Sequence, residues 1–275
     1  MEAPKGNPKE ASTAEALDPA DGELDVGRAA RKRAQVECLA SYALQMMEPT
    51  TKVVEFGAGS GHLGLLLASQ RSDCQVVLVE AKEYSADVAA RRIEGTGISN
   101  CRVFHGTVDA FAATGEEFDL AVGLHLCGLL TDAVLGLARR RFAEACVVPC
   151  CYGQVATLKE DHRRGEGTAQ RMHPCSKAMR MIPREAFAWC AKAADFTAGK
   201  GGAFDPKSDG FRTALKCMRI VDTDRLWTAR EEGFEGMLGT LQQGCSPKCS
   251  VICVRRIPKR EEADEVDAAC DKQGA

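Results

Sequence analysis

Apolar and polar positions divide the first half of the chain into short hydrophobic runs and longer amphipathic stretches. The runs have the length of buried strands, and they are KVVEF, QVVLVE, NCRVFHG, FDLAVGLHL and ACVVPCC. The stretches between them have helical periodicity, as in LGLLLASQ, SADVAARRIEGTG and LTDAVLGLARRRF. This alternation predicts right-handed βαβ units and a parallel sheet with helices on both faces.

An amphipathic helix is predicted before the first strand, over GRAARKRAQVECLASYALQMM. Its apolar positions share one face, and they are Val36, Leu39, Tyr42, Ala43 and Met46. Its opening turns are basic, with Arg28, Arg31, Lys32 and Arg33. Two interpretations of this basic cluster stay open, a solvated helix face and a contact with a phosphate group.

The alternation stops at residues 154–213, which we interpret as an insertion over the sheet edge with one helix around REAFAWCAKAAD. Beyond it, KCMRIVDTDRLWTAREEG predicts a helix, and FEGMLGTL and SVICVRRI predict two more strands. The expected organisation is therefore one folded domain over residues 28–257, which contains the insertion, between two tails at 1–27 and 258–275.

Charge separates the tails from the folded part. Residues 1–27 hold two basic and seven acidic groups, and residues 258–275 hold three basic and six acidic groups. Both tails are weakly hydrophobic, so we expect them to be disordered. The total charge of −3 leaves residues 28–257 with a balance of +5. That balance permits a phosphate-bearing partner such as RNA and does not require one.

Cysteine use and hydropathy indicate a reducing compartment. The chain has 14 cysteines among 275 residues, scattered singly and often within apolar runs, which is typical of reduced, buried thiols. No apolar run approaches the roughly 18 residues of a membrane span. The amino-terminal segment lacks the apolar core of a secretory signal. We therefore predict a cytoplasmic protein without a membrane segment.

The stretch VVEFGAGSGHLG places glycines 57, 59 and 61 between a buried strand and a helix. Such a loop lets the backbone approach a ligand at the amino-terminal end of the helix. Gly59, Gly61 and Gly64 also satisfy the dinucleotide pattern G-x-G-x-x-G. However, Glu55 precedes the loop, and its carboxylate suits the cationic methionyl end of S-adenosylmethionine better than a pyrophosphate. The predicted cofactor is S-adenosylmethionine, with NAD(P) as the alternative.

Two more features bear on the cofactor and the fold class. Glu80 ends the second strand, 21 positions after Gly59, where a carboxylate accepts ribose hydroxyls of either cofactor. The helix and two strands after the fifth parallel strand correspond to the reversed hairpin of methyltransferases. The predicted fold is a Rossmann-like class I methyltransferase, an α/β fold with a seven-stranded, mostly parallel sheet and a C-terminal antiparallel strand.

Several segments together resemble the methyltransferase domain of glutathione S-transferase C-terminal domain-containing proteins. They are KVVEFGAGSGHLGLLLA, QVVLVEAKEYS, VGLHLCGLLTDAV and VVPCCYG, followed by HPCSKAM, CMRIVDTDRLWTAREEGF and CSPK. The layout is more distantly similar to tRNA 2′-O-methyltransferases of the Trm13 type. The resemblance covers roughly residues 28–257 and implies cofactor positions at Glu55, Gly57, Gly59, Gly61 and Glu80. It implies no glutathione function, because the chain has no room for a glutathione transferase-like domain.

The HLCG and PCCYG motifs follow the fourth and fifth strands, whose carboxyl ends should flank the transferred methyl group. The candidate catalytic residues are His125, Cys127, Cys150, Cys151 and Tyr152. The favoured role is a dry wall that positions the acceptor. Acid–base action of His125 or Tyr152, a Cys₃His zinc site and a thiol nucleophile stay open. No metal is expected, because adjacent Cys150 and Cys151 would point to opposite faces if the strand continued.

Weaker candidates complete the predicted site. His105 and Val108 follow the third strand, where methyltransferases usually contact adenine, and Val108 is assigned to cofactor binding. The insertion is basic through His162, Arg163, Arg164, Arg171, His173, Lys177, Arg180 and Arg184. A nucleic-acid clamp would have this composition, but so would a solvated loop. The predicted function is methyl transfer to an unidentified acceptor, with an NAD(P)-dependent oxidoreductase and a non-catalytic cofactor-binding protein as alternatives.

Overall fold

The structure is a computed structural model, and it describes residues 17–18, 26–156, 173–197, 205, 207–242 and 244–257. Nearly all of both predicted tails, and the insertion residues His162, Arg163, Arg164 and Arg171, lie outside the described residues. Among the helices that are described, none combines the length and the apolar character needed to span a bilayer.

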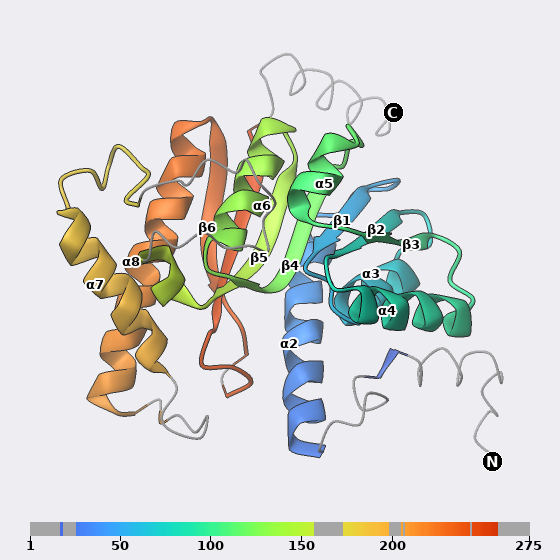
Figure 1. The fold of residues 1–275 in the computed structure, drawn as a ribbon, viewed down its shortest axis with the longest axis horizontal. Coiled ribbons are helices and arrows are strands. Elements are labelled where there is room, and N and C mark those ends of the chain that lie inside the picture. Colours follow the sequence, from blue (N-terminus) through green and yellow to red (C-terminus); the bar gives the residue numbers. More distant parts are fainter. Residues whose placement is uncertain are drawn as a thin grey trace, which may run out of the picture.

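A seven-stranded sheet forms the centre of the described part, with the order β3-β2-β1-β4-β5-β7-β6 (Figure 1). Its strands are β1 (Lys52–Phe56), β2 (Gln75–Glu80), β3 (Cys101–His105), β4 (Leu120–Cys127), β5 (Glu144–Cys150), β6 (Phe234–Thr240) and β7 (Ser250–Arg256). Strands β1 to β5 run parallel to one another, and β7 runs antiparallel to both β5 and β6. The predicted fold class is therefore confirmed.

Helices cover both faces of this sheet. One face packs against α2 (Val26–Leu44), α3 (His62–Gln70) and α4 (Glu83–Thr96), and the other against α5 (Val108–Ala113), α6 (Leu129–Arg140) and α8 (Asp209–Glu231). Successive strand residues point to opposite faces, so Val53 and Glu55 lie on the α2 and α3 side, whereas Val54 and Phe56 lie on the α6 side. This register places the Glu55 carboxylate under the loop that follows β1.

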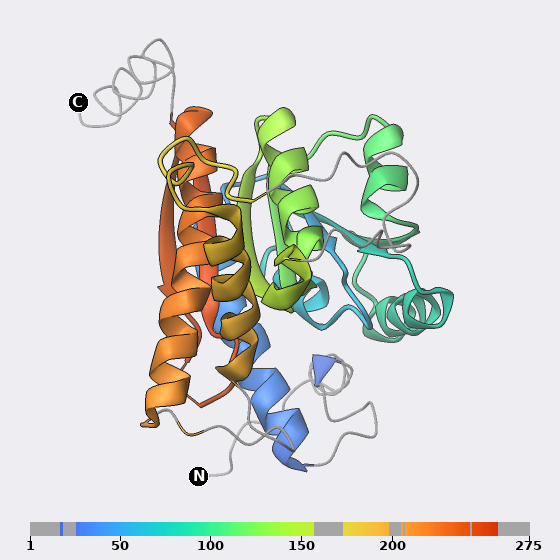
Figure 2. The ribbon, with the colours of Figure 1, turned by 60° about the vertical axis from the view of Figure 1, so that its left-hand side comes forward.

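The insertion adds a third, smaller core beside the sheet. Helix α7 (Arg184–Ala193) lies alongside α8 in both views (Figures 1 and 2). The short helices η2 (Tyr152–Ala156) and η3 (Ala194–Thr197) complete this layer. Its buried residues are Tyr152, Phe187, Ala191, Ala194, Met218 and Val221. The insertion is thus packed against the amino-terminal half of α8.

Two helical starts differ from the sequence prediction, and side-chain caps explain both. Helix α8 begins at Asp209, inside the stretch assigned to the insertion, because the Ser208 hydroxyl accepts the Phe211 N–H at 3.1 Å. Helix α5 was not predicted, and the Thr107 hydroxyl caps it by accepting the Ala110 N–H at 3.1 Å. That cap holds Val108 buried in the first turn of α5.

Candidate functional site

The glycine loop joins β1 to α3, and its backbone has a conformation that residues with side chains rarely adopt. Gly57, Gly59 and Gly61 have φ values of 64°, 57° and 79°. A Cβ on Gly59 would meet nothing within 4 Å, so the backbone here faces open space. Gly64 is different, because a Cβ there would lie 2.2 Å from Leu78 Cδ2. The loop therefore presents bare backbone to a ligand, while Gly64 lets α3 pack closely on β2.

Two buried carboxylates hold this loop in place. Glu80 Oε2 accepts the Gly59 N–H at 2.8 Å, and its Oε1 accepts the Lys82 N–H at 2.8 Å. Glu55 Oε2 accepts the Gly64 N–H at 2.8 Å. Burial raises the pKa of Glu55 to about 7, against the opposing effects of the Gly64 hydrogen bond and of Lys32. Glu55 is therefore a carboxyl group that changes charge near neutral pH.

A cavity of about 390 Å³ lies between this loop and the start of α2. From α2 it is lined by Arg28, Arg31, Lys32 and Gln35, and from the sheet side by Glu55, Gly57, Ala58, Gly59, Ser60, His62 and Leu124. Three members of the predicted basic cluster thus face the glycine loop. The fourth, Arg33, instead pairs with Asp18 at 2.6 Å. The cavity therefore combines positive groups on one wall with a buried carboxyl group on the other.

His62 at the start of α3 lines the cavity, although it is not among the site residues predicted from the sequence. Its Nδ1 accepts a hydrogen bond from Arg92 Nη1 at 2.6 Å, and its Nε2 lies 3.1 Å from Ser60 Oγ. Burial, Arg92 and Lys32 lower the pKa of His62 to about 3. The imidazole is therefore neutral. Its position in the helix start directly after the last loop glycine is the sequence signal that could have identified it.

His125 sits where β4 is irregular. The β4–β5 register shifts between Leu124 and Leu126, and His125 has a φ of 63°. Its Nε2 lies 2.8 Å from the side-chain oxygen of Gln35, which also lines the cavity. Burial lowers the pKa of His125 to about 4, and the positive charge of Lys32 adds to this effect. A neutral ring whose Nε2–H donates to Gln35 keeps Nδ1 as its acceptor.

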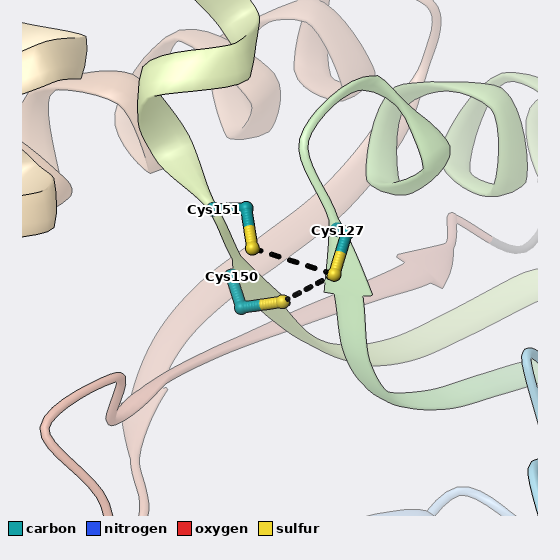
Figure 3. A group of neighbouring side chains, drawn as sticks. All are labelled: Cys127, Cys150 and Cys151. Carbon is teal, nitrogen blue, oxygen red and sulfur yellow. Dashed lines mark hydrogen bonds between the residues drawn. The ribbon is translucent and has the colours of Figure 1, made fainter. Parts of the chain in front are cut away.

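Three cysteine thiols converge at the carboxyl ends of β4 and β5 (Figure 3). Cys127 Sγ lies 3.1 Å from Cys150 Sγ and 3.4 Å from Cys151 Sγ. The contact with Cys127 raises the pKa values of the Cys150 and Cys151 thiols. The expectation that Cys150 and Cys151 point apart depended on a continuing strand. Strand β5 instead ends at Cys150, and a φ of 50° turns Cys151 toward Cys127.

Tyr152 lies in the third core, away from solvent. Its ring is fully buried, and its hydroxyl donates to Asp222 Oδ2 at 2.7 Å. Burial and the Asp222 carboxylate raise the pKa of Tyr152 well above its ordinary value. A hydroxyl that is already donating to a buried carboxylate is poorly placed to take a proton from an acceptor. The geometry therefore gives Tyr152 an anchoring contact with α8.

The remaining predicted residues lie at the other end of the site. His105 ends β3, and its position pairs with Glu80 across the parallel register. Val108 is in the first turn of α5, just past the same sheet edge. The structure thus places Glu80, His105 and Val108 on neighbouring strand ends and the cysteines on the other side of β1. The cavity beside the glycine loop lies between these two groups.

Comparison with known proteins supports one of the predicted function classes. Residues 31–158 match a family described as a methyltransferase domain. The glutathione S-transferase C-terminal domain-containing protein homolog of Drosophila melanogaster is 33% identical over 232 residues, which are 84% of this chain and 37% of that protein. The human glutathione S-transferase C-terminal domain-containing protein is 30% identical over 240 residues, which are 86% of this chain and 35% of that protein.

The chain therefore spans little more than a third of the length of these curated relatives. Among solved structures, a fibrillarin/Nop5p complex has a TM-score of 0.46 at 12% identity, over 80% of each chain. That similarity is too low to inform function. The resemblance predicted from the glycine, HLCG and PCCYG segments is confirmed by the sequence relatives. Residues 31–158 of this chain match the methyltransferase domain family, and over 84% and 86% of its length the chain is similar to the Drosophila melanogaster and human glutathione S-transferase C-terminal domain-containing proteins.

Proposed function

We propose that this protein is an S-adenosylmethionine-dependent methyltransferase whose cofactor occupies the cavity between α2 and the glycine loop. The observation that carries the proposal is the opposition of Arg28, Arg31 and Lys32 to Glu55 across that cavity. The methionyl end of the cofactor carries a carboxylate and an ammonium group. Basic side chains on one wall match the carboxylate, and the Glu55 carboxylate on the other wall matches the ammonium group. A pyrophosphate carries only negative charge and would have no use for the second contact.

The other predicted cofactor residues extend the same arrangement. Gly57, Gly59 and Gly61 leave the loop backbone bare where a ligand would pass. Each Glu80 oxygen already accepts one backbone N–H, and each has a second lone pair for a ribose hydroxyl. Val108 is a largely buried apolar side chain at the start of α5, at the sheet edge where the adenine ring would lie.

The bound cofactor would supply an electrophilic methyl group on a sulfonium centre. The chain's own residues would exclude water and hold the acceptor in line with it, which is most of what a methyl transfer to a good nucleophile requires. His125 and the cysteines at the ends of β4 and β5 form this wall. Neutral His125 presents an Nδ1 lone pair, so it is the group best placed to take a proton from a hydroxyl or amine acceptor.

RNA is the proposed class of acceptor, because residues 28–257 have a balance of +5 and Lys177, Arg180 and Arg184 add basic groups beside α7. Binding to total tRNA at increasing salt tests this class, since phosphate contacts make affinity fall steeply with salt. A flat salt dependence would exclude it. The cytoplasmic location is a proposal as well, and it fits the number of thiols.

Calorimetric titration with S-adenosylmethionine, and in parallel with NADH, tests the proposed cofactor. We expect binding of S-adenosylmethionine alone, and a loss of roughly 10- to 100-fold in Glu80→Gln, since a hydrogen bond to a charged group contributes about 1.5–3 kcal/mol. Glu83→Gln is the matched control, because Glu83 is exposed at the start of α4. Binding of NADH alone would overturn the proposal. A thermal melt of each variant separates lost binding from lost folding.

A further inference from the structure

The group formed by Cys127, Cys150 and Cys151 has the donor atoms of a metal site. All three Sγ atoms lie within 4.8 Å of one another (Figure 3). Three thiolates bound to one tetrahedral Zn²⁺ at about 2.3 Å each would be separated by about 3.8 Å. The two Sγ separations to Cys127, 3.1 Å and 3.4 Å, are slightly shorter than this value. Small side-chain rotations would therefore open the group enough to admit the ion.

The backbone around these thiols has positive φ angles at two non-glycine residues, and these angles help to bring the thiols together. Only four non-glycine residues of the described part have a positive φ, and two of them are His125 and Cys151. Such conformations are strained and persist where the surrounding structure enforces them. Backbone hydrogen bonds hold the segment that contains Cys151, since Gly128 N–H donates to the Cys150 carbonyl at 2.8 Å and Gln154 N–H donates to the Cys151 carbonyl at 3.1 Å.

The conformations of Cys151 and His125 direct a thiol and a carbonyl oxygen toward the same group of cysteines. The positive φ of Cys151 brings its thiol back to Cys127, as the contact of 3.4 Å shows. The bulge at His125 directs its carbonyl oxygen into the group, 3.2 Å from Cys150 Sγ and 3.7 Å from Cys127 Sγ. Two segments that are 23 residues apart in sequence thus meet with their donor atoms together.

We propose that Cys127, Cys150 and Cys151 form a three-thiolate site for Zn²⁺ at the acceptor side of the methyl-transfer cavity. Among the described residues, no fourth histidine, cysteine or acidic side chain joins the group. Three protein ligands with one open position are typical of catalytic zinc sites, whereas structural zinc sites are closed by four. Water or the methyl acceptor fills the fourth position. That last role rests on the proposed methyl transfer, but the metal site itself does not.

Charge and geometry favour a metal over a disulfide. A divalent cation can take the place of the thiol protons, and its charge then offsets the repulsion between the three thiolates that bind it. A disulfide would need an S–S distance of about 2.05 Å, and it would leave the third thiol without a role. The cysteines are also connected to the cavity, because Gln35 lines the cavity and bonds the ring of His125, whose carbonyl contacts the thiols.

The test is titration of the reduced, metal-free chain with Zn²⁺ alone, and of a separate metal-free sample with Co²⁺ as a spectroscopic probe. We expect one ion per chain and a thiolate-to-cobalt charge-transfer band. Cys127→Ser, Cys150→Ser and Cys151→Ser should each weaken Zn²⁺ binding by more than the roughly 10- to 100-fold that loss of an outer-shell partner costs. Cys190→Ser is the matched control, since Cys190 contacts another thiol, Cys217, outside this group. Its affinity should equal that of the wild type.

Three results would overturn the metal site. They are a wild-type chain that binds no Zn²⁺, serine variants that all retain it, and a mass lower by two hydrogens with Cys127 linked to Cys150 in the protein as isolated. S-adenosylmethionine binding is measured on the same samples. A chain that binds S-adenosylmethionine but not Zn²⁺ would overturn this inference alone, and a chain that binds Zn²⁺ but not S-adenosylmethionine would overturn only the proposed function.

Discussion

His173 and Asp224 join the insertion to helix α8 through a buried contact of 2.8 Å between Nδ1 and Oδ2. Asp224 also accepts the N–H groups of Cys175 and Ser176, at 2.8 Å and 2.9 Å. On its other side, His173 Nε2 lies 3.2 Å from Asp132 Oδ1 in α6. One imidazole therefore connects two carboxylates from two helices, and Phe187 of α7 stacks on its ring.

This contact should make the free energy of unfolding fall as pH rises above about 6.5. Burial alone would lower the pKa of His173, but Asp132 and Asp224 raise it to about 11, from an ordinary value near 6.5. A raised pKa gives stability that is complete below pH 6.5 and is lost as pH rises toward 11. We expect the free energy of unfolding of the wild type to fall more steeply than that of His173→Gln, by up to about 1.4 kcal/mol per pH unit.

Urea unfolding of both proteins between pH 7 and pH 9.5 measures this difference. Comparing slopes cancels the titration of other groups, such as the lysines and cysteines, that both proteins share. The charged groups that face His173 are Asp132, Asp224 and, through Asp132, Arg225. Equal slopes in the two proteins would show that His173 is not charged in the folded state.

The sheet was predictable because its strands are buried on both faces. A parallel strand such as β2 presents apolar side chains to helices on each side, so it leaves a continuous hydrophobic run in the sequence. The glycine loop was predictable for a similar reason, since its function requires residues without side chains at fixed spacing. Both signals are local, and each is contained in fewer than about 15 residues.

The site details were less predictable because they depend on distant contacts and on unusual backbone. Nothing in the helix sequence distinguishes Arg31, which faces the cavity, from Arg33, which pairs with Asp18. The left-handed conformation of Cys151 has no sequence signal, since glycine is the residue expected there. The sequence around Tyr152 predicts a site residue, because its partner Asp222 lies 70 positions later and the hydrogen bond between them appears only in the structure.

Arg225 should be the most sensitive charged residue for stability. It pairs with Asp132 at 2.9 Å and with Asp222 at 3.1 Å, and all three side chains are buried. Arg225→Met would leave Asp222 buried without its cation and Asp132 with His173 as its remaining partner, and we expect a loss of about 3–5 kcal/mol in the free energy of unfolding. Arg212→Met on the same helix is the control. Its ion pair with Asp209 is exposed, so it should cost less than about 1 kcal/mol. Denaturant unfolding compares the two, and similar losses would contradict the buried network.

Gly64→Ala should disturb the cofactor site through packing. The added Cβ would lie 2.2 Å from Leu78 Cδ2 and 2.9 Å from Glu55 Oε2, so α3 must move away from the sheet. We expect a loss of about 1–3 kcal/mol in stability together with weaker binding of S-adenosylmethionine. Gly95→Ala is the control, because nothing lies within 4 Å of its Cβ position in α4, and it should gain about 0.4–1 kcal/mol. Unchanged cofactor affinity in a folded Gly64→Ala protein would argue against Glu55 as a contact.

The last prediction concerns the charge of Glu55. Its pKa of about 7 lies above its value in the unfolded chain, so the folded protein binds the proton more tightly. The cofactor-free protein should therefore lose stability as pH rises from about 4.5 to 7. A cationic ligand reverses this effect, because it favours the ionised carboxylate. We expect affinity for S-adenosylmethionine to rise roughly tenfold between pH 6 and pH 7.5.

Calorimetric titration across that range measures the effect, and its upper limit stays below the pKa of an α-amino group, about 7.7–8.0. Glu55→Gln keeps the size of the side chain but cannot ionise, so its affinity should be low and nearly independent of pH. Glu80→Gln should also bind weakly, yet it should keep the pH dependence because Glu55 is intact. If Glu55→Gln shows the same rise with pH as the wild type, another group controls binding, and the ammonium contact assigned to Glu55 is wrong.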